Sequence, residues 1–371
     1  MGSGSASGGS TAVRDVGPAA RVPLLVLGLV ALILGVAGGL VRLGFALPAP
    51  AAGIVWHGAL MASAFFGTLI SIERAVAIGR WWAYGAPAAC GAGGIALLLS
   101  DTRLGFALLV LGAALYVLAS GVIYLRQRTL HTGVLALGAL GLLAANLALA
   151  AGLPSEAAVP SWIAFFALTI GGERLELSRL APVPPAARLG FGVLSAAVLA
   201  SALLALWSFD AGLRIGGALL LLSAGWLARY DIASRTVRAS GLTRYIAVCL
   251  LAGYAWLALG GALLAARGGF TGGRDLWDAA LHAVFIGFVF SMVFGHAPVI
   301  LPAVLRVAFP YRGVLYVPLV LLHVTLVVRV LGDFGVASGW RGAGGAGNAL
   351  AIALFIVVAA ALVLGRSARS R

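Results

Sequence analysis

Long apolar runs alternate with short polar or glycine-rich breaks along almost the whole chain. An α-helix needs about 20 mostly apolar residues to cross the hydrocarbon core of a bilayer, and most of these runs approach that length. The pattern therefore predicts an all-α integral membrane protein with about twelve transmembrane helices. The predicted spans are residues 22–41, 53–72, 82–100, 104–125, 132–152, 157–173, 189–208, 212–229, 244–266, 279–304, 314–332 and 347–365.

Composition and charge support this class. The chain is 62% hydrophobic and only 10% charged, which is more apolar surface than one soluble core could bury. The formal net charge of +14 comes from arginines at the ends of apolar runs, where they act as topology signals and contact lipid headgroups. The bilayer is therefore the expected partner, and nucleic acid is not. Eighteen of the 25 arginines fall on the side of the termini, which predicts that both termini are cytoplasmic.

The ends of the chain differ from its middle. Residues 1–20 are rich in glycine, serine and alanine, and such segments cannot bury enough apolar surface to fold. We therefore expect a disordered cytoplasmic tail at 1–20 and a single twelve-helix domain at 21–366. A short basic cytoplasmic tail should follow at 367–371.

A short pattern occurs twice, 100 residues apart. The two copies are Phe65-Phe66 with Glu73-Arg74 and Phe165-Phe166 with Glu173-Arg174. Four predicted spans separate them, and four more lead to a span in which His296 takes roughly the place of the glutamates. This spacing predicts three quasi-equivalent units of four helices. Glu73 and Glu173 are candidates for a proton path, although a charge-compensated stop signal at a span end also explains them.

Two histidines are candidate ligands for a heme iron. His57 and His282 each lie near the outer start of a span, and the two spans run in the same direction, so both imidazoles reach the same depth. A bis-histidine heme needs two neutral imidazoles supplied by separate helices at matched depth. The alternative is that each is an interfacial histidine bonded to a backbone carbonyl or a lipid phosphate.

A heme at this depth would need cations for its two propionates. The candidates are Arg42, Arg329, Arg341 and the neighbouring Trp340. Arginine matches the planar geometry of a carboxylate, which favours this interpretation. Ordinary interfacial arginines and an interfacial tryptophan would show the same pattern.

His296 and His323 are candidates for a second site, either for a metal or for proton transfer, because an ionisable group within a span suggests function. Met292 lies four residues before His296, and Met61 four residues after His57. Histidine with methionine suits copper(I), but a methionine that fills a packing gap is the alternative. On an ideal helix, His282 and His296 would share one face to within about 40°.

Three stretches resemble the NnrS-type membrane proteins, a branch of the heme-copper oxidase subunit I fold. They are HGALMASAFFGTLISIERAVAIG, HAVFIGFVFSMVFGHAPVILPAVL and YVPLVLLHVTLVVRVLGD. At the level of spans the resemblance covers roughly residues 20 to 365. It implies heme b bound by His57 and His282, copper, a link to nitric oxide, and a bacterial cytoplasmic membrane.

The sequence departs from the catalytic oxidases where their binuclear centre lies. The sixth span reads SWIAFFALTIGGER, the seventh has no histidine, and Val284 stands where the oxidases repeat a histidine. Dioxygen reduction coupled to proton pumping is therefore not expected. The expected function is a heme protein in electron transfer, with a possible redox partner, or in the nitric oxide response. The alternative is a proton-coupled solute transporter without heme, in which His296, His323 and the two glutamates line the path.

Overall fold

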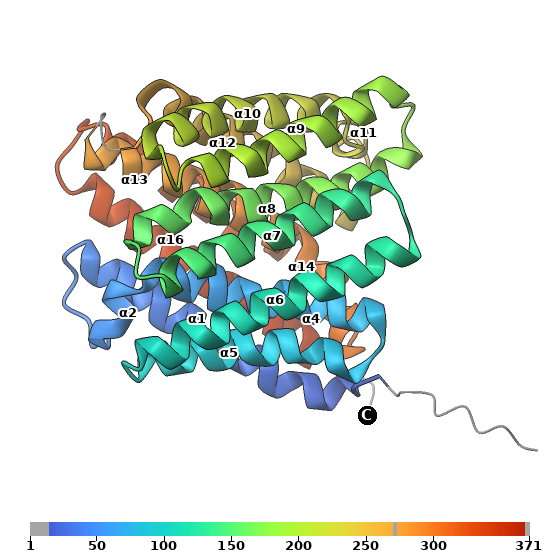
Figure 1. The fold of residues 1–371 in the computed structure, drawn as a ribbon, viewed down its shortest axis with the longest axis horizontal. Helices are drawn as coiled ribbons and strands as arrows, with labels where there is room; N and C mark the ends of the chain where they lie inside the picture. The colour runs from blue at the N-terminus through green and yellow to red at the C-terminus, as the bar shows by residue number, and fades with distance from the viewer. Residues whose placement is uncertain (1–14, 270–272, 368–371) are drawn as a thin grey trace, which may run out of the picture.

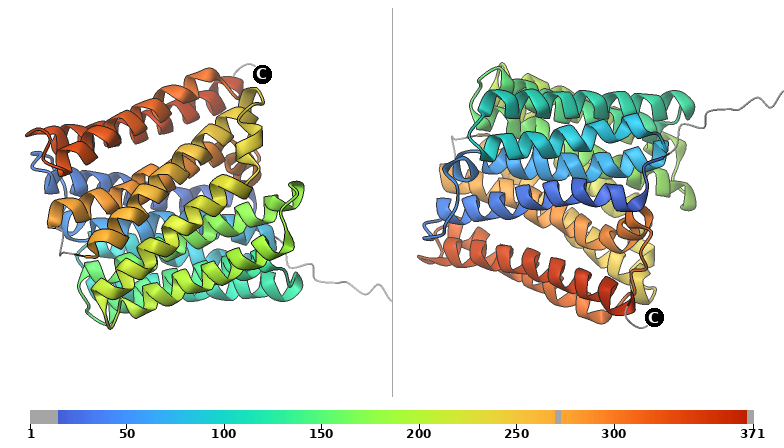
Figure 2. Two further views of the ribbon diagram at one scale, coloured as in Figure 1. Left: turned by 90° about the horizontal axis from the view of Figure 1, so that it is seen from above. Right: turned by 90° about the horizontal axis from the view of Figure 1, so that it is seen from below.

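The computed structural model describes residues 15–269 and 273–367, and this part of the chain consists of helices without a strand. The helices lie side by side in one bundle (Figures 1 and 2). α1 (Pro18–Arg42) begins and α16 (Trp340–Ser367) ends at one end of the bundle, which we call the terminal end. α2 (Ala51–Val55) and α13 (Arg274–His282) lie at the opposite end, which we call the distal end (Figure 1).

Between these helices the chain passes from one end of the bundle to the other. The remaining α-helices are α3 (His57–Ala59), α4 (Gly67–Ile78), α5 (Gly85–Leu98), α6 (Thr102–Arg126), α7 (Leu130–Ala150), α8 (Ser155–Leu177), α9 (Pro185–Leu204), α10 (Phe209–Tyr230), α11 (Ala233–Thr236), α12 (Gly241–Arg267), α14 (Ser291–Leu305) and α15 (Tyr316–Asp333). Two π-helical segments are η1 (Leu60–Phe66) and η4 (Ala283–Phe290). Short 3-10 turns are η2 (Trp81–Tyr84), η3 (Ser178–Leu180) and η5 (Gly313–Leu315).

Within the described residues, ten helices or helical runs are long and apolar enough to cross a membrane, so the chain is a multi-pass all-α membrane protein. The predicted spans 82–100 and 157–173 fall on helices outside those ten. α5 has only 14 residues, and α8 carries Glu156 and Glu173 within its 23. The sides of α8 are buried almost throughout, so it faces protein more than lipid and needs a less apolar surface.

The tail predicted at residues 1–20 extends too far toward the C-terminus, because its last residues belong to helix α1. α1 begins at Pro18, and Asp15 before it accepts a hydrogen bond from Arg21 at 2.7 Å. Arg21 is 1% exposed and also donates to the carbonyl oxygen of Val304 at 2.6 Å. A buried guanidinium needs such partners, and this requirement orders the chain from Asp15 onward. Residues 1–14 and 368–371 lie outside the described residues.

Glycines allow neighbouring helices to approach closely, as in the contact between α10 and α12. A Cβ on Gly217 would lie 2.6 Å from the carbonyl oxygen of Gly261 and closer still to the amide of Ala265. Small residues at such interfaces let backbones pack in the absence of a hydrophobic driving force between helices.

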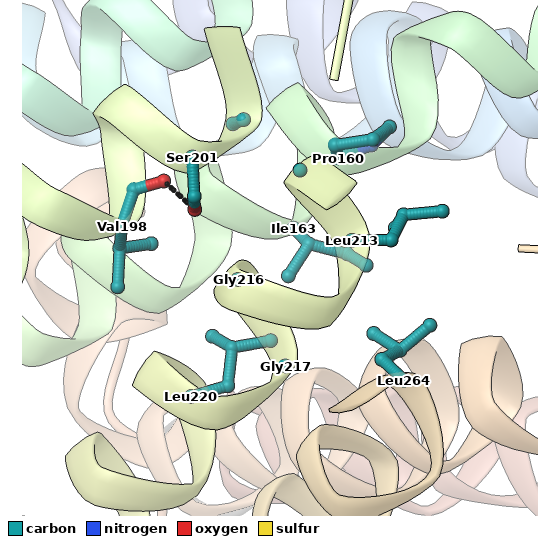
Figure 3. A pocket seen from close by; sticks show the side chains of 11 residues that line it. Pro160, Ile163, Val198, Ser201, Leu213, Gly216, Gly217, Leu220 and Leu264 are labelled. Atoms are coloured by element: carbon teal, nitrogen blue, oxygen red, sulfur yellow. Dashed lines mark hydrogen bonds between the residues drawn. The ribbon is translucent and has the colours of Figure 1, made fainter. Parts of the chain in front are cut away.

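A cavity of about 20 Å³ remains beside this contact (Figure 3). Pro160, Ile163 and Leu220 are among the side chains that line it, and the hydroxyl of Ser201 donates to the carbonyl oxygen of Val198 at 2.8 Å. This space holds at most about one water molecule, so we regard it as a packing gap.

Replacing Gly217 by alanine should lower the free energy of unfolding by about 1–3 kcal/mol, because the added methyl group overlaps the backbone of α12. The matched control is Gly225→Ala on the same helix, where a Cβ meets nothing within 4 Å. Alanine there should be neutral or stabilising by up to about 1 kcal/mol. Thermal unfolding in detergent compares the two. Equal midpoints for both variants would contradict the packing role.

Candidate cofactor site

A cavity of about 460 Å³ opens among the helices at the distal end. Its walls come from α1, the helical run α2–η1, the start of α8, the run α13–η4, α15 and α16. This volume falls within the range of small-molecule and cofactor sites, about 300–1,000 Å³. The residues that line it include both candidate heme ligands, His57 and His282, although 224 residues stand between them in the chain.

Both histidines stand within one turn before a π-helical segment. His57 begins α3, which continues into η1, and His282 ends α13, which continues into η4. A π turn holds an extra residue and so rotates the side chains that follow relative to those before it, and such turns are frequent at functional sites. The prediction that His282 and His296 share one helix face assumed an ideal α-helix. It does not apply, because η4 lies between them.

The surroundings of His57 define which ring nitrogen carries the hydrogen. Its Nδ1 lies 2.6 Å from the carbonyl oxygen of Gly35 on α1, and a carbonyl can only accept a hydrogen bond. Nδ1 therefore donates, and in the neutral ring Nε2 carries the lone pair. A Cβ on Gly39 would lie 2.8 Å from Cε1 of the same ring, so α1 needs a glycine there to make room for the imidazole.

His282 has the same tautomer for a different reason. Nη2 of Arg329 lies 3.1 Å from its Nε2, and a guanidinium can only donate, so Nε2 accepts. Nδ1 then donates to the carbonyl oxygen of Asp278 at 2.9 Å, and a carboxylate oxygen of Asp278 lies 3.3 Å away. The carboxylate of Asp278 also accepts from Arg329 at 2.9 Å. Asp278, which the sequence analysis did not single out, thus holds both groups in place.

Of the four residues predicted to bind propionates, three line the cavity and Trp340 does not. Arg42, Arg329 and Arg341 all line the cavity. Arg341 is held by Asp275 at 2.5 Å and by Asp333 at 3.0 Å. Trp340 begins α16 but is not among the lining residues. Asp278 lies four residues, or one helical turn, before His282, and this spacing could have revealed it as the carboxylate partner of His282. Nothing in the sequence indicates that Arg341 pairs with Asp275 of α13.

Aromatic rings form the part of the cavity farthest from the distal end. Phe66, Phe166 and Phe290 come from three different helices, and the ring of Phe66 lies 4.8 Å from that of Phe166 and 5.4 Å from that of Phe290. Phe66 and Phe166 are the equivalent members of the repeated Phe-Phe pattern. The structure therefore brings the two copies of this repeat together at the floor of the cavity.

His296 and His323 lie outside this cavity and have separate partners. Nε2 of His296 accepts from Arg174 at 2.7 Å, and its Nδ1 donates to the carbonyl oxygen of Met292 at 2.8 Å. Nδ1 of His323 accepts from the indole of Trp256 at 3.0 Å. No group of three or more histidine, cysteine, aspartate or glutamate side chains is arranged for a metal in residues 15–269 and 273–367. A second metal site at this pair, with copper, stays a prediction from the sequence.

Glu73 and Glu173 lie toward the terminal end, on the far side of the aromatic floor from the two cavity histidines. Glu173 pairs with Arg74 at 2.7 Å, so the two copies of the Glu-Arg repeat also meet. The carboxylate comes from α8 and the guanidinium from α4, and Phe66 of η1 contacts Phe166 of α8, so the run η1–α4 approaches α8 at two levels. The ion pair is not part of the cavity.

The comparison with curated proteins gave no match, and neither did the comparison with solved structures. A family model matches residues 21–364, which covers the bundle from the first turn of α1 to near the end of α16. Because this match spans almost the whole chain, the protein belongs to the family described as Domain of unknown function (DUF8744).

Proposed function

We propose that this protein is an integral membrane heme protein, in which His57 and His282 bind one b-type heme in the distal cavity. The observation that carries the proposal is that these two histidines, from distant parts of the chain, line one cavity of about 460 Å³. The sequence resemblance to NnrS-type proteins supports the same assignment. It adds a place in the bacterial cytoplasmic membrane, and the distribution of arginines predicts both termini in the cytoplasm.

The residues present fit a heme. His57 and His282 each use Nδ1 as a donor to a main-chain carbonyl, which leaves on Nε2 the lone pair that ligates iron. Aromatic side chains line the cavity, and Arg42, Arg329 and Arg341 supply guanidinium groups for two propionates. Nε2 of His282 accepts from Arg329 at 3.1 Å, so His282 would have to release this guanidinium to hold iron, and Arg329 would then be available to a propionate.

A bound heme would supply one-electron chemistry or a site for nitric oxide. His57 and His282 would both be ligands of the iron, and two protein ligands favour electron transfer over the binding of nitric oxide. The chain's own part is to hold both imidazoles neutral and oriented and to surround the site with apolar rings.

We also propose that the chain crosses the membrane twelve times in three quasi-equivalent units. Equivalent contacts between helices of successive units support the three units. Arg74 contacts Glu173 on α8, and Arg174, the equivalent residue on α8, contacts His296 on α14 in the same relation. Glu73, Glu173 and His296 are the equivalent residues of the three proposed units. Each arginine thus contacts the residue of the next unit that stands at this equivalent position.

Purified wild-type protein should show the absorption spectrum of a six-coordinate b-type heme, with a sharp alpha band on reduction. His57→Ala and His282→Ala should each lose this band, because iron loses one of its two protein ligands. His323→Ala is the control, since Trp256 already occupies its Nδ1 outside the cavity. Its spectrum should match the wild type. A colourless wild-type protein from heme-replete cells would reject the proposal and favour the proton-coupled transporter.

Asp278→Asn should weaken heme retention about 10-fold or more, because the carboxylate that orients His282 and Arg329 is lost. The matched control is Asp275→Asn on the same helix, whose carboxylate is 63% exposed and pairs with Arg341 but, among the described residues, with neither His282 nor Arg329. Transfer of heme to an excess of apo-myoglobin measures retention for both variants. A similar loss rate in the two would show that Asp278 has no special part in holding His282.

A further inference from the structure

A cluster of charged side chains lies between helices toward the terminal end of the bundle, apart from the distal cavity. Glu73 and Arg74 come from α4, and Glu173 and Arg174 come from α8. His296 of α14 also belongs to the cluster, because it contacts Arg174. Phe66 and Phe166, which form the cavity floor, precede Glu73 and Glu173 by seven residues, or about 10 Å along a helix.

His296 is neutral in this arrangement. Arg174 donates to its Nε2 at 2.7 Å, and a guanidinium has no lone pair to accept a hydrogen bond in return. Nε2 must therefore carry the lone pair, while Nδ1 donates to Met292. His296 cannot take a proton without giving up Arg174, so a proton that enters the cluster has to bind elsewhere.

The two glutamates of the cluster differ in their partners. Glu173 accepts from Arg74 at 2.7 Å and so forms an ion pair with it. Glu73 interacts electrostatically with Glu173, Arg74 and Arg174, but its carboxyl has no hydrogen bond or ion pair to any other side chain in the described part of the chain. Two carboxyls that share a site cannot easily both be ionised away from water.

Further groups face this cluster from the remaining helices. Asp231, at the end of α10, is 1% exposed, accepts from Tyr254 of α12 and has one carboxylate oxygen without a partner. It interacts electrostatically with His296. Tyr116 of α6 is 1% exposed, faces both glutamates, and has an unpartnered hydroxyl. His131 of α7 interacts with Arg74 but is bonded to Thr129 at 2.9 Å.

The charges of these groups do not cancel. With all three carboxyls counted as ionised, those of Glu73, Glu173 and Asp231 would stand with two guanidinium groups, those of Arg74 and Arg174, while His296 and the tyrosines are neutral. One negative charge is therefore left over within a membrane-spanning bundle, where an uncompensated charge is unfavourable. Binding of a single proton removes it.

We propose that the carboxyl group of Glu73 is a proton-binding site, which holds one proton that the cluster as a whole needs for neutrality. The hydroxyl of Tyr116, which faces both glutamates, has no hydrogen-bond partner of its own among the described residues. The site is separated from the distal cavity by the rings of Phe66, Phe166 and Phe290. It exists whether or not the cavity binds heme, so its test does not depend on the proposed function.

Infrared spectroscopy of the full-length protein in lipid nanodiscs tests this site. As the pH falls from alkaline toward neutral, wild-type protein should gain the C=O stretching band of one protonated carboxylic acid, and the band should shift in D₂O. Glu73→Gln should lose this band. The variant should keep the thermal stability of the wild type, because glutamine resembles the protonated acid in shape and charge.

Two further variants separate a proton site from a merely structural cluster. Glu176→Gln on α8 is the matched control, since this carboxylate is 42% exposed at the same end of the bundle and pairs with Arg179. Its band should equal that of the wild type. Glu173→Gln leaves Arg74 without its partner and should lower thermal stability, unlike Glu73→Gln. A band that persists in Glu73→Gln, or no titrating carboxylic acid in the folded wild type, would overturn the proposal.

Discussion

The interior of the bundle has little water for its polar side chains, so each of them has to find partners within the protein. This constraint governs how the histidines are held. In His57, His282 and His296, Nδ1 donates to a main-chain carbonyl oxygen. The lone pair is then on Nε2, where a guanidinium or a metal can meet it. The same tautomer thus occurs at both ends of the molecule, fixed by a main-chain carbonyl at His57 and also by an arginine at Nε2 of His282 and His296.

The same helices carry two different polar sites at two levels. Near the distal end, the run that contains His57 and the run that contains His282 enclose a cavity with arginines among its lining. Farther along, the continuations of these runs, with α8, carry the charged cluster around Glu73 and His296. Aromatic rings lie between the two levels. This aromatic layer separates the two polar sites within the bundle.

The sequence predicted the helical membrane class and most helix positions, because apolar length and charged breaks are local properties. The predicted spans 82–100 and 157–173 show the limit of that signal, since α5 has only 14 residues and α8, buried almost throughout, carries charged residues. The two copies of the repeated Phe-Phe and Glu-Arg patterns contact each other in the structure, since Phe66 packs against Phe166 and Arg74 pairs with Glu173. Asp278 was missed, although it lies one turn before His282.

The sequence by itself determined which residue types stand at which depth, since helix rise relates position along the chain to position across a bilayer. It thereby predicted His57 and His282 at one level. Only the tertiary structure decided which faces meet, because π-helical segments after both histidines change the rotation of the side chains that follow. It also decided that Arg174 holds His296 while Glu73 is left without a counter-ion of its own. Such pairings depend on how helices far apart in sequence pack, and no local pattern encodes them.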